Sequence, residues 1–424
     1  MPVTALRPFV GALTSAALIA GAAAGSASPA SGAAIEEYAM PGDGILRIQG
    51  GGWGHGRGMS QWGAYQAARE GRSFAEILDF YYPGTALTEV PGSSVRVLLA
   101  TDTGRNVVVR AAPGLTASFT ASSVDRVVEL AKEPTRCTKT PTRWRARAVR
   151  KGVRLMAYCK RWVTVVPGKR IESGRITFEV PGGIVGTQSR QVRRGYRGAV
   201  TADRQGARSL RAINTLPMDT YLRPVVAAEV SPSWPVESLR AQAVAARSYA
   251  AHEALGRAGQ SFDVYDSVRS QAYPGAVWYD RRWKVTRDRE HARTNQAIAD
   301  TAGIYVTAGG KPALTQFSSS NGGATAVSPL PHMVAAVDVW DSRATPNSRR
   351  AWTDSVSAST LRARYPRAGA IRAIRVLARE GAGSWGGRVS TLEVVGANRS
   401  YTLTSDSAIR AALGVHSSFL TFTS

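Results

Sequence analysis

Hydrophobic and polar positions alternate in some stretches of the chain and recur at helical spacing in others. Strand-like runs, bounded by glycine and proline turns, lie at residues 94–101, 106–112, 175–180 and 390–396. Helical patterns concentrate at residues 59–80, 219–255 and 287–301. This mixture predicts an α+β fold, in which a helical lobe packs against a largely antiparallel β-sheet core.

One predicted helix carries a glutamate where an apolar residue is expected. Asp219 can cap this helix. Its apolar positions recur once per turn, at Tyr221, Leu222, Val225 and Val226. Glu229 comes four residues after Val225, so its carboxyl group falls on or beside the buried face. Burial disfavours the charged form and raises the pKa, which makes Glu229 a candidate general acid. The alternative is a residue at the edge of the stripe that reaches water.

The helix is expected to end between Ser231 and Pro235, because a proline restricts the residue before it. Pro235 suits the first turn of a second helix, which is rich in alanine from residue 241 to residue 251. Small side chains allow a neighbouring helix to approach closely. Gln242 and Arg247 can therefore lie near Glu229 as orienting groups.

The first 34 residues have the composition of a targeting segment. They hold one charge, Arg7, then an apolar run over residues 9–24, and then small residues that offer cleavage points between Ala27 and Ala34. This resembles a secretory signal peptide, and an uncleaved membrane anchor is the alternative. Since no later segment approaches membrane-spanning length, we expect a secreted protein.

Two cysteines, Cys137 and Cys159, follow this segment. Outside the cytoplasm an even pair most simply forms one disulfide. Closing that loop contributes on the order of 3 kcal/mol to stability. A metal site is the competing use of cysteine, but no histidine lies between or near the two.

The chain is strongly basic, with a formal net charge of +24. Its densest basic run, residues 143–162, interleaves Trp144, Tyr158 and Trp162 with arginine and lysine. Inside a cell this pattern favours nucleic acid, but export excludes that partner. The anions outside are wall polymers, peptide carboxylates and lipid headgroups, and a solvated basic face without a ligand is the alternative.

Three further clusters are polar and rich in glycine: residues 50–68, 266–275 and 317–326. Each alone is typical of a structural turn, and Ser60 in the first can also cap a helix. Together they offer aromatic faces and uncharged hydrogen-bonding groups, which suit a carbohydrate. With Gln242 and Arg247, the candidate substrate-binding residues are Trp53, His55, Ser60, Gln61, Gln271, Tyr273, Ser319, Ser320 and Asn321.

These clusters resemble the SpoIID/LytB family of bacterial cell-wall proteins. The resemblance rests on YLRPVVAAEVSPSWPVESLRAQAVAARSYA, DSVRSQAYPG, FSSSNGGATA and the segment GGGWGHGRGMSQWGAYQAA with YYPGT, and on shorter matches at residues 196–200, 213–222 and 338–342. In that family the glutamate matching Glu229 is the proposed acid of a lytic transglycosylase. The resemblance therefore implies cleavage of the MurNAc–GlcNAc bond of peptidoglycan, with formation of 1,6-anhydro-MurNAc. Some family members hold zinc with a cluster of cysteine and histidine that this sequence lacks, so we expect no metal, and the reaction needs no other cofactor.

One departure from the family concerns chain order. Family members usually carry the GWGHGxGMSQxGA and YYPGT segments last, whereas here they come first, at residues 53–85. Circular permutation predicts that residues 45–49 pair with residues 419–422. The expected parts are a signal peptide at 1–34, a permuted segment at 35–92 that completes the core, a β-rich part at 93–200 with the basic run and disulfide, and a catalytic core at 201–424.

Other functions remain open from the residues. The same resemblance is also consistent with a non-catalytic glycan-binding module or with an amidase enhancer of the LytB type. A glycan hydrolase would need a second carboxylate, with Asp266 and Asp338 as candidates. A serine hydrolase is disfavoured because no GxSxG motif surrounds the serines of residues 317–326. The expected partners are peptidoglycan glycan strands, with anionic wall polymers and a wall amidase as further candidates.

Overall fold

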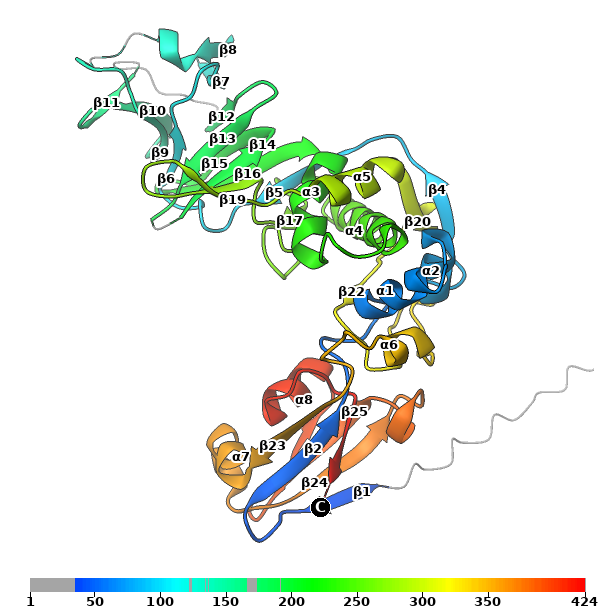
Figure 1. Ribbon diagram of the computed structural model, residues 1–424. Coiled ribbons are helices and arrows are strands. Elements are labelled where there is room, and N and C mark those ends of the chain that lie inside the picture. Colours follow the sequence, from blue (N-terminus) through cyan, green and yellow to red (C-terminus); the bar gives the residue numbers. More distant parts are fainter. Residues whose placement is uncertain are drawn as a thin grey trace, which may run out of the picture.

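The computed structural model describes residues 35–121, 124–133, 135, 137–165, 174–190 and 192–423. The predicted signal peptide at 1–34 lies outside them. Figure 1 shows a bent, elongated molecule of three lobes in a row. We call them the β-lobe (β5–β19 without the helices), the helical lobe (α1–α6 with β3, β4 and β20–β22) and the C-terminal lobe (β1, β2 and residues 352–423).

The β-lobe contains two large sheets whose pairings are antiparallel except for that of β17 with β5. In sheet order the first holds β11 (Trp162–Thr164), β10 (Gly152–Tyr158), β9 (Arg143–Val149), β6 (Asn106–Arg110), β13 (Ile184–Gln188), β14 (Arg193–Arg197), β18 (Val277–Tyr279) and β19 (Val285–Asp288). The second holds β17 (Val264–Tyr265), β5 (Ser94–Leu98), β16 (Ser209–Pro217), β15 (Ala199–Gly206), β12 (Arg175–Glu179), β7 (Thr116–Ala121) and β8 (Val124–Glu129). The predicted strand runs at 94–101, 106–112 and 175–180 are confirmed. In β6, for example, Val107 and Val109 point into the core while their neighbours are partly exposed.

The predicted disulfide is present in this lobe. Cys137 and Cys159 are bonded, with their Cα atoms 5.8 Å apart. The bond ties the segment before β9 to the residue that follows β10, 22 positions later, and so closes the base of the β9–β10 hairpin.

The helical lobe is built around one long alanine-rich helix. Its helices are α1 (Gln61–Arg69), α2 (Phe74–Tyr81), α3 (Met218–Glu229), α4 (Val236–Gly256), α5 (Ala292–Asp300) and α6 (Val339–Arg343), and its strands are β3 (Met59–Ser60), β4 (Ala86–Glu89), β20 (Ile304–Ala308), β21 (Lys311–Pro312) and β22 (Phe317–Ser318). Helix α4 contributes Ala243 and Ala246 to the core shared with the β-lobe, and Ala241 and Ala245 to a second core with α1 and α2. Small side chains let both neighbours approach it. No helix in the described part of the chain is long and apolar enough to cross a membrane.

The boundary predicted between α3 and α4 is confirmed, but the predicted cap of α3 is wrong. Pro217 precedes the helix, and no side chain caps it. The Asp219 carboxylate, in the first turn, instead accepts a hydrogen bond from Arg247 Nε at 3.0 Å. The buried guanidinium needs a charged partner, and Asp219 supplies one across the α3–α4 contact.

The C-terminal lobe has its own core and contains both ends of the described chain. Its two sheets hold β1 (Glu36–Ala39), β24 (Ile371–Arg379), β25 (Val389–Gly396) and β26 (Tyr401–Leu403), and β23 (Trp352–Ser357), β2 (Ile45–Gly50) and β27 (Leu420–Thr423). Helices α7 (Ala358–Arg364) and α8 (Asp406–Leu413) cover them. In Figure 1 the blue strand β2 lies among the orange and red elements of this lobe.

The pairing predicted between the two chain ends is present. Strand β2 is antiparallel to β27, with Ile48 opposite Phe422 and Gly50 opposite Leu420. Both Ile48 and Phe422 are buried in the core of this lobe. From β2 the chain passes directly into the helical lobe, so the first described residues contribute to two lobes.

Candidate active site

Glu229 lines a cavity in the helical lobe. It is the last residue of α3, and its half-buried side chain lines a cavity of about 380 Å³. The lining residues come from the glycine-rich segment, α1, α3, α4 and two loops: His55, Gln61, Glu229, Tyr249, Val268, Arg269, Ser270, Gln271, Ala272, Gln316, Phe317, Ser318 and Ser319. Among them Glu229 is the one carboxylate.

Two donors hold the Glu229 carboxyl group. The backbone N–H of Ala272 donates to Oε1 at 3.3 Å, and Gln61 Nε2 donates to Oε2 at 3.5 Å. Burial raises the pKa of Glu229 above its ordinary value, although both hydrogen bonds oppose the shift. Glu229 thus lies on the same face of α3 as the buried apolar residues. Because it is the last residue of the helix, its side chain also reaches the cavity.

Among the described residues, two buried polar atoms near Glu229 have no hydrogen-bond partner. Gln242 accepts a hydrogen bond from Gln61 Nε2 at 3.4 Å, but within the described residues its own amide nitrogen donates to nothing. The hydroxyl of Ser318, in the cavity wall, is also buried without a partner there. Since buried polar groups are nearly always hydrogen-bonded, the Ser318 hydroxyl, which lines the cavity, is suited to a polar ligand.

The glycine-rich segment brings His55 to this cavity by packing closely on residues 316–322. A Cβ on Gly54 would lie 2.9 Å from Cβ of Ser318, and one on Gly58 would lie 2.1 Å from the carbonyl oxygen of Gln316. Both glycines also have positive φ, which other residues rarely adopt. Steric contact and backbone conformation therefore each exclude a side chain at these positions. Burial lowers the pKa of His55 to about 4, which leaves the ring neutral at neutral pH, and its Nδ1 accepts from the Arg57 N–H at 3.0 Å.

Several predicted site residues do meet at this cavity. His55, Gln61, Gln271 and Ser319 line it, whereas Gln242 is outside the lining and accepts a hydrogen bond from Gln61. The Gln271 amide is held in place, since its oxygen accepts from Tyr221 Oη at 3.0 Å and its nitrogen donates to the Ala246 carbonyl at 3.2 Å.

Four other predicted residues lie outside the cavity lining, in buried structural hydrogen bonds. Ser60 caps α1 and donates to Asp341, and Ser320 donates to the other oxygen of the same carboxylate. The Asn321 amide donates to Asp338 at 2.7 Å. Tyr273 is buried in the core, with its hydroxyl bonded to Asn214. These groups satisfy buried carboxylates and amides, which requires them to point inward.

Trp53 and Arg247 also lie elsewhere. The Trp53 ring stacks on His416 with ring centroids 3.9 Å apart, and the Arg349 guanidinium covers it. Arg247 is fully buried and donates to Asp219 and to the carbonyl oxygens of Ile298 and Ile304. The prediction that Arg247 orients Glu229 is therefore wrong: it joins α3, α4 and α5.

Neither candidate for a second carboxylate lines the cavity. Asp338 is fully buried under Tyr81 and Asn321, and Asp266 accepts from the Ala100 N–H and lies 3.9 Å from Arg194. Across the described ranges, no group of three or more His, Cys, Asp or Glu side chains is arranged to hold a metal ion.

Sequence reasoning missed several lining residues, notably Ser318, Tyr249 and Gln316. Ser318 stands in the same FSSSNGG segment as the serines that were predicted, but alternation along β22 alone does not say which hydroxyl faces the cavity. Tyr249 comes seven residues after Gln242 on α4, a spacing of two helical turns that places both on one face.

The region around Glu229 is similar to proteins already known. Residues 206–307 match the family model described as SpoIID, Stage II sporulation protein. An uncharacterized protein of Brachyspira hyodysenteriae is 38% identical over 114 residues, which cover 27% of this chain and 28% of that protein.

Two relatives from Bacillus subtilis carry functional names. The amidase enhancer is 61% identical over 41 residues, covering 10% of this chain and 6% of its own length. Stage II sporulation protein D is 24% identical over 142 residues, which cover 31% of this chain and 41% of that protein. The matches therefore span less than half of each relative's own length. No solved structure matches the chain.

Proposed function

Because this chain belongs to the SpoIID/LytB family, we propose that it is a secreted, wall-associated protein that cleaves peptidoglycan glycan strands as a lytic transglycosylase. One observation carries the proposal. Glu229 is the only carboxylate among the residues described in the cavity lining, and burial raises its pKa. A glycosidase that activates water uses two carboxylates, whereas a sugar hydroxyl that attacks within the substrate needs one group acting first as acid and then as base.

The reaction can be written for this one carboxyl group. Protonated Glu229 gives its proton to the glycosidic oxygen as the C1–O bond of N-acetylmuramic acid breaks. The C6 hydroxyl oxygen of the same sugar then bonds to C1, and the Glu229 carboxylate takes its proton. The products are a 1,6-anhydro end and a free 4-hydroxyl on N-acetylglucosamine. No water is consumed, and Glu229 ends protonated as it began.

Neutral groups around Glu229 are suited to holding the sugar. Gln61 and the Ala272 N–H bind the carboxylate form, and therefore support the base step. The Ser318 hydroxyl, which lines the cavity and has no partner within the described residues, offers a hydrogen bond to an N-acetyl or hydroxyl group of the sugar.

The test is digestion of purified glycan strands, with and without stem peptides, followed by mass spectrometry for anhydromuramic ends. We expect wild type to form them, Glu229→Gln to form none, and Glu253→Gln to match wild type. Glu253 is a suitable control because it loses the same charge on α4, outside the cavity. Identical product profiles for wild type and Glu229→Gln would sink the proposal, and reducing ends would indicate a hydrolase.

A second candidate function is enhancement of a wall amidase, favoured by the 61% identity to the amidase enhancer of Bacillus subtilis. In this case the chain would bind glycan without cleaving it. Release of stem peptides by an added wall amidase would then increase equally with wild type and Glu229→Gln.

We also propose that the family fold is circularly permuted here. In the antiparallel β2–β27 pair, Arg47 stands opposite Thr423, so a short hairpin turn could join the end of β27 to the start of β2. A rearranged chain that runs from residue 93 to 423, through such a turn, into residues 45–92 should fold and keep its activity. Loss of folding despite several turn lengths would contradict the permutation.

A further inference from the structure

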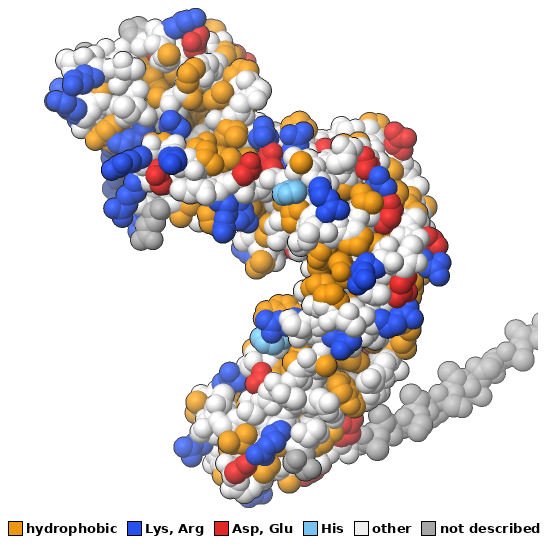
Figure 2. Space-filling model, viewed as in Figure 1, with side chains coloured by type: hydrophobic (Ala, Val, Ile, Leu, Met, Phe, Trp, Pro, Cys, Tyr) orange, Lys and Arg blue, Asp and Glu red, His pale blue; other side chains and the backbone are white. Residues whose placement is uncertain are grey.

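The excess positive charge of the chain is concentrated in the β-lobe. Residues 101–200 hold 21 lysines and arginines against six aspartates and glutamates, and thus account for +15 of the net +24. Figure 2 shows lysine and arginine gathered over this lobe, at the upper left of the view. A field of one sign raises the local concentration of oppositely charged ligands.

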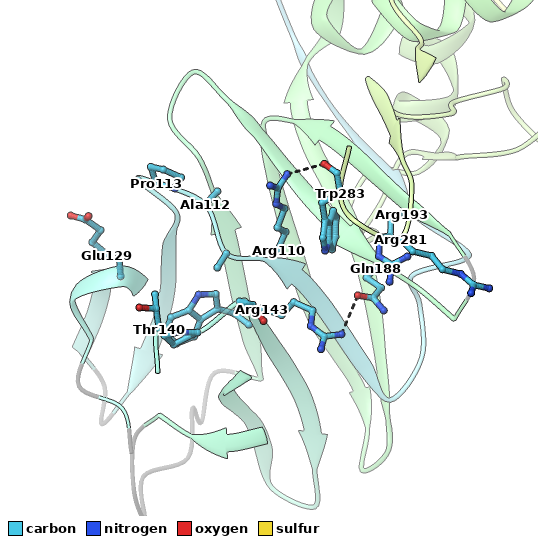
Figure 3. A pocket seen from close by; sticks show the side chains of 16 residues that line it. Arg110, Ala112, Pro113, Glu129, Thr140, Arg143, Gln188, Arg193, Arg281 and Trp283 are labelled. Carbon is cyan, nitrogen blue, oxygen red and sulfur yellow. Dashed lines mark hydrogen bonds between the residues drawn. The ribbon is translucent and has the colours of Figure 1, made fainter. Parts of the chain in front are cut away.

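The same lobe contains a cavity of about 910 Å³, larger than the one at Glu229. Its walls come from the ends of neighbouring strands: the end of β6, the start of β9, the end of β13, the start of β14 and the turn between β18 and β19. Register places Arg110 opposite Arg143 and Gln188 opposite Arg193. Antiparallel pairing thus brings several basic side chains together at the same end of neighbouring strands (Figure 3).

Four arginines line this cavity, and none of them is neutralised by a carboxylate in the described structure: Arg110, Arg143, Arg193 and Arg281. The one acidic lining residue, Glu129, is at the far side of the cavity and pairs with Lys132 at 2.7 Å. Arg143 donates to the Gln188 side chain at 3.3 Å, and Arg110 to the Trp283 carbonyl at 3.4 Å. Arg193 Nε is buried and has no partner in the part of the chain that is described.

Aromatic rings hold these guanidinium groups in place. Arg110 and Arg193 lie 5.5 and 5.4 Å from the centre of the Trp283 ring. Arg143 lies 3.9 Å from that of Tyr158. Contact with an aromatic face orients a guanidinium but leaves its charge and most of its N–H donors free, unlike an ion pair.

Trp283 is itself positioned by the backbone. It has positive φ in the β18–β19 turn, and its ring lies over Gly186, where a Cβ would come within 3.1 Å of the ring. Glycine at 186 therefore gives the ring room against the sheet, beside the arginines. A half-exposed planar ring next to charged donors is suited to a sugar ring that carries an anionic group.

We propose that this cavity is a binding site for an anionic polysaccharide, separate from the Glu229 cavity. A sugar ring lies against Trp283, and its phosphate or carboxylate group is bound by Arg110, Arg143 and Arg193. Such a site would hold the protein on the anionic polymers of a cell wall while Glu229 acts on uncharged glycan nearby.

The test is calorimetric titration of the full chain carrying Glu229→Gln, so that cleavage plays no part. The probes are poly(glycerol phosphate), polygalacturonate and uncharged dextran of matched length. The cavity variant is Arg110→Gln with Arg193→Gln. The control is Lys151→Gln with Arg154→Gln, two exposed residues of the same lobe outside this cavity, which remove the same charge. Circular dichroism checks that each variant is folded.

We expect at least one polyanion to bind and dextran not to bind. The cavity variant should weaken binding roughly tenfold or more, since each guanidinium loses a charged hydrogen bond, and the control by about twofold. Trp283→Asn, a residue that tolerates positive φ, should weaken binding as well. Which polyanion binds identifies phosphodiester or carboxylate as the ligand group. Equal losses in cavity variant and control, binding to dextran, or binding to neither polyanion would overturn the proposal.

Discussion

Replacing Arg247 tests directly whether this residue stabilises the packing of α3, α4 and α5. Its side chain is fully buried, and it donates to the Asp219 carboxylate and to the carbonyl oxygens of Ile298 and Ile304. Arg247→Met keeps a long apolar stem but removes every donor. Buried hydrogen bonds from a charged group contribute about 1.5–3 kcal/mol each and are not additive, so we expect a loss of about 3 kcal/mol.

The loss of stability should be confined to the region around α3, α4 and α5, and catalysis by the folded protein should be unaffected. Hydrogen exchange followed by mass spectrometry should show reduced protection in peptides from α3, α4 and α5, and little change in the C-terminal lobe, which has a separate core. Asp219→Asn tests the same pair from the other side. Asparagine keeps an oxygen that can accept from Arg247 but removes the charge, and since the guanidinium is fully buried, we expect a loss of about 3 kcal/mol in the same three helices.

Activity completes the test. Per folded molecule, Arg247→Met should cleave glycan nearly as fast as wild type, because the arginine does not line the Glu229 cavity. If Arg247→Met kept normal protection but lost cleavage, Arg247 would be a site residue, and our structural interpretation would be refuted.

Three further predictions concern the Glu229 carboxyl group, the disulfide and a buried aspartate. Gln61→Leu removes a donor that favours the charged form of Glu229, so its pKa should rise and the alkaline limb of the pH–rate profile should move to higher pH; an unmoved limb would contradict this. Replacing Cys137 and Cys159 by serine should destabilise the β-lobe by about 3 kcal/mol in denaturant unfolding and leave glycan cleavage unchanged. Burial raises the pKa of Asp341 from 3.8 to about 6, so the native state binds this proton more tightly and stability falls as pH rises between those values. Asp341→Asn should therefore change its melting temperature less than wild type between pH 4 and pH 6, and equal changes would refute this.

Much of the fold could be predicted because it follows from local pattern. Alternation along β6, the prolines between α3 and α4, and the single pair of cysteines each express a constraint that acts over a few residues or through one bond. The β2–β27 pairing is a long-range contact, and it was predicted from motif order rather than from periodicity.

The candidate site could be predicted only in part, because one residue type serves two purposes. Ser320 and Ser318 are two residues apart in a run of three serines. Ser320 is bonded to the buried carboxylate of Asp341, whereas Ser318, in the cavity wall, has no partner in the described part of the chain. The amino-acid sequence does not distinguish a serine whose hydroxyl bonds to a buried carboxylate from one whose hydroxyl remains free for a ligand.

Local pattern and composition were therefore enough to predict the α+β fold, the basic charge, the disulfide and the position of Glu229 on an otherwise apolar stripe. The packing of distant elements had to be known before one could see which groups surround Glu229, that Arg247 joins three helices, and that four residues share one cavity: Arg110, Arg143, Arg193 and Trp283. The reason is physical. Periodicity reports which face of an element is buried, but the partner of each polar group depends on elements brought together from distant parts of the chain.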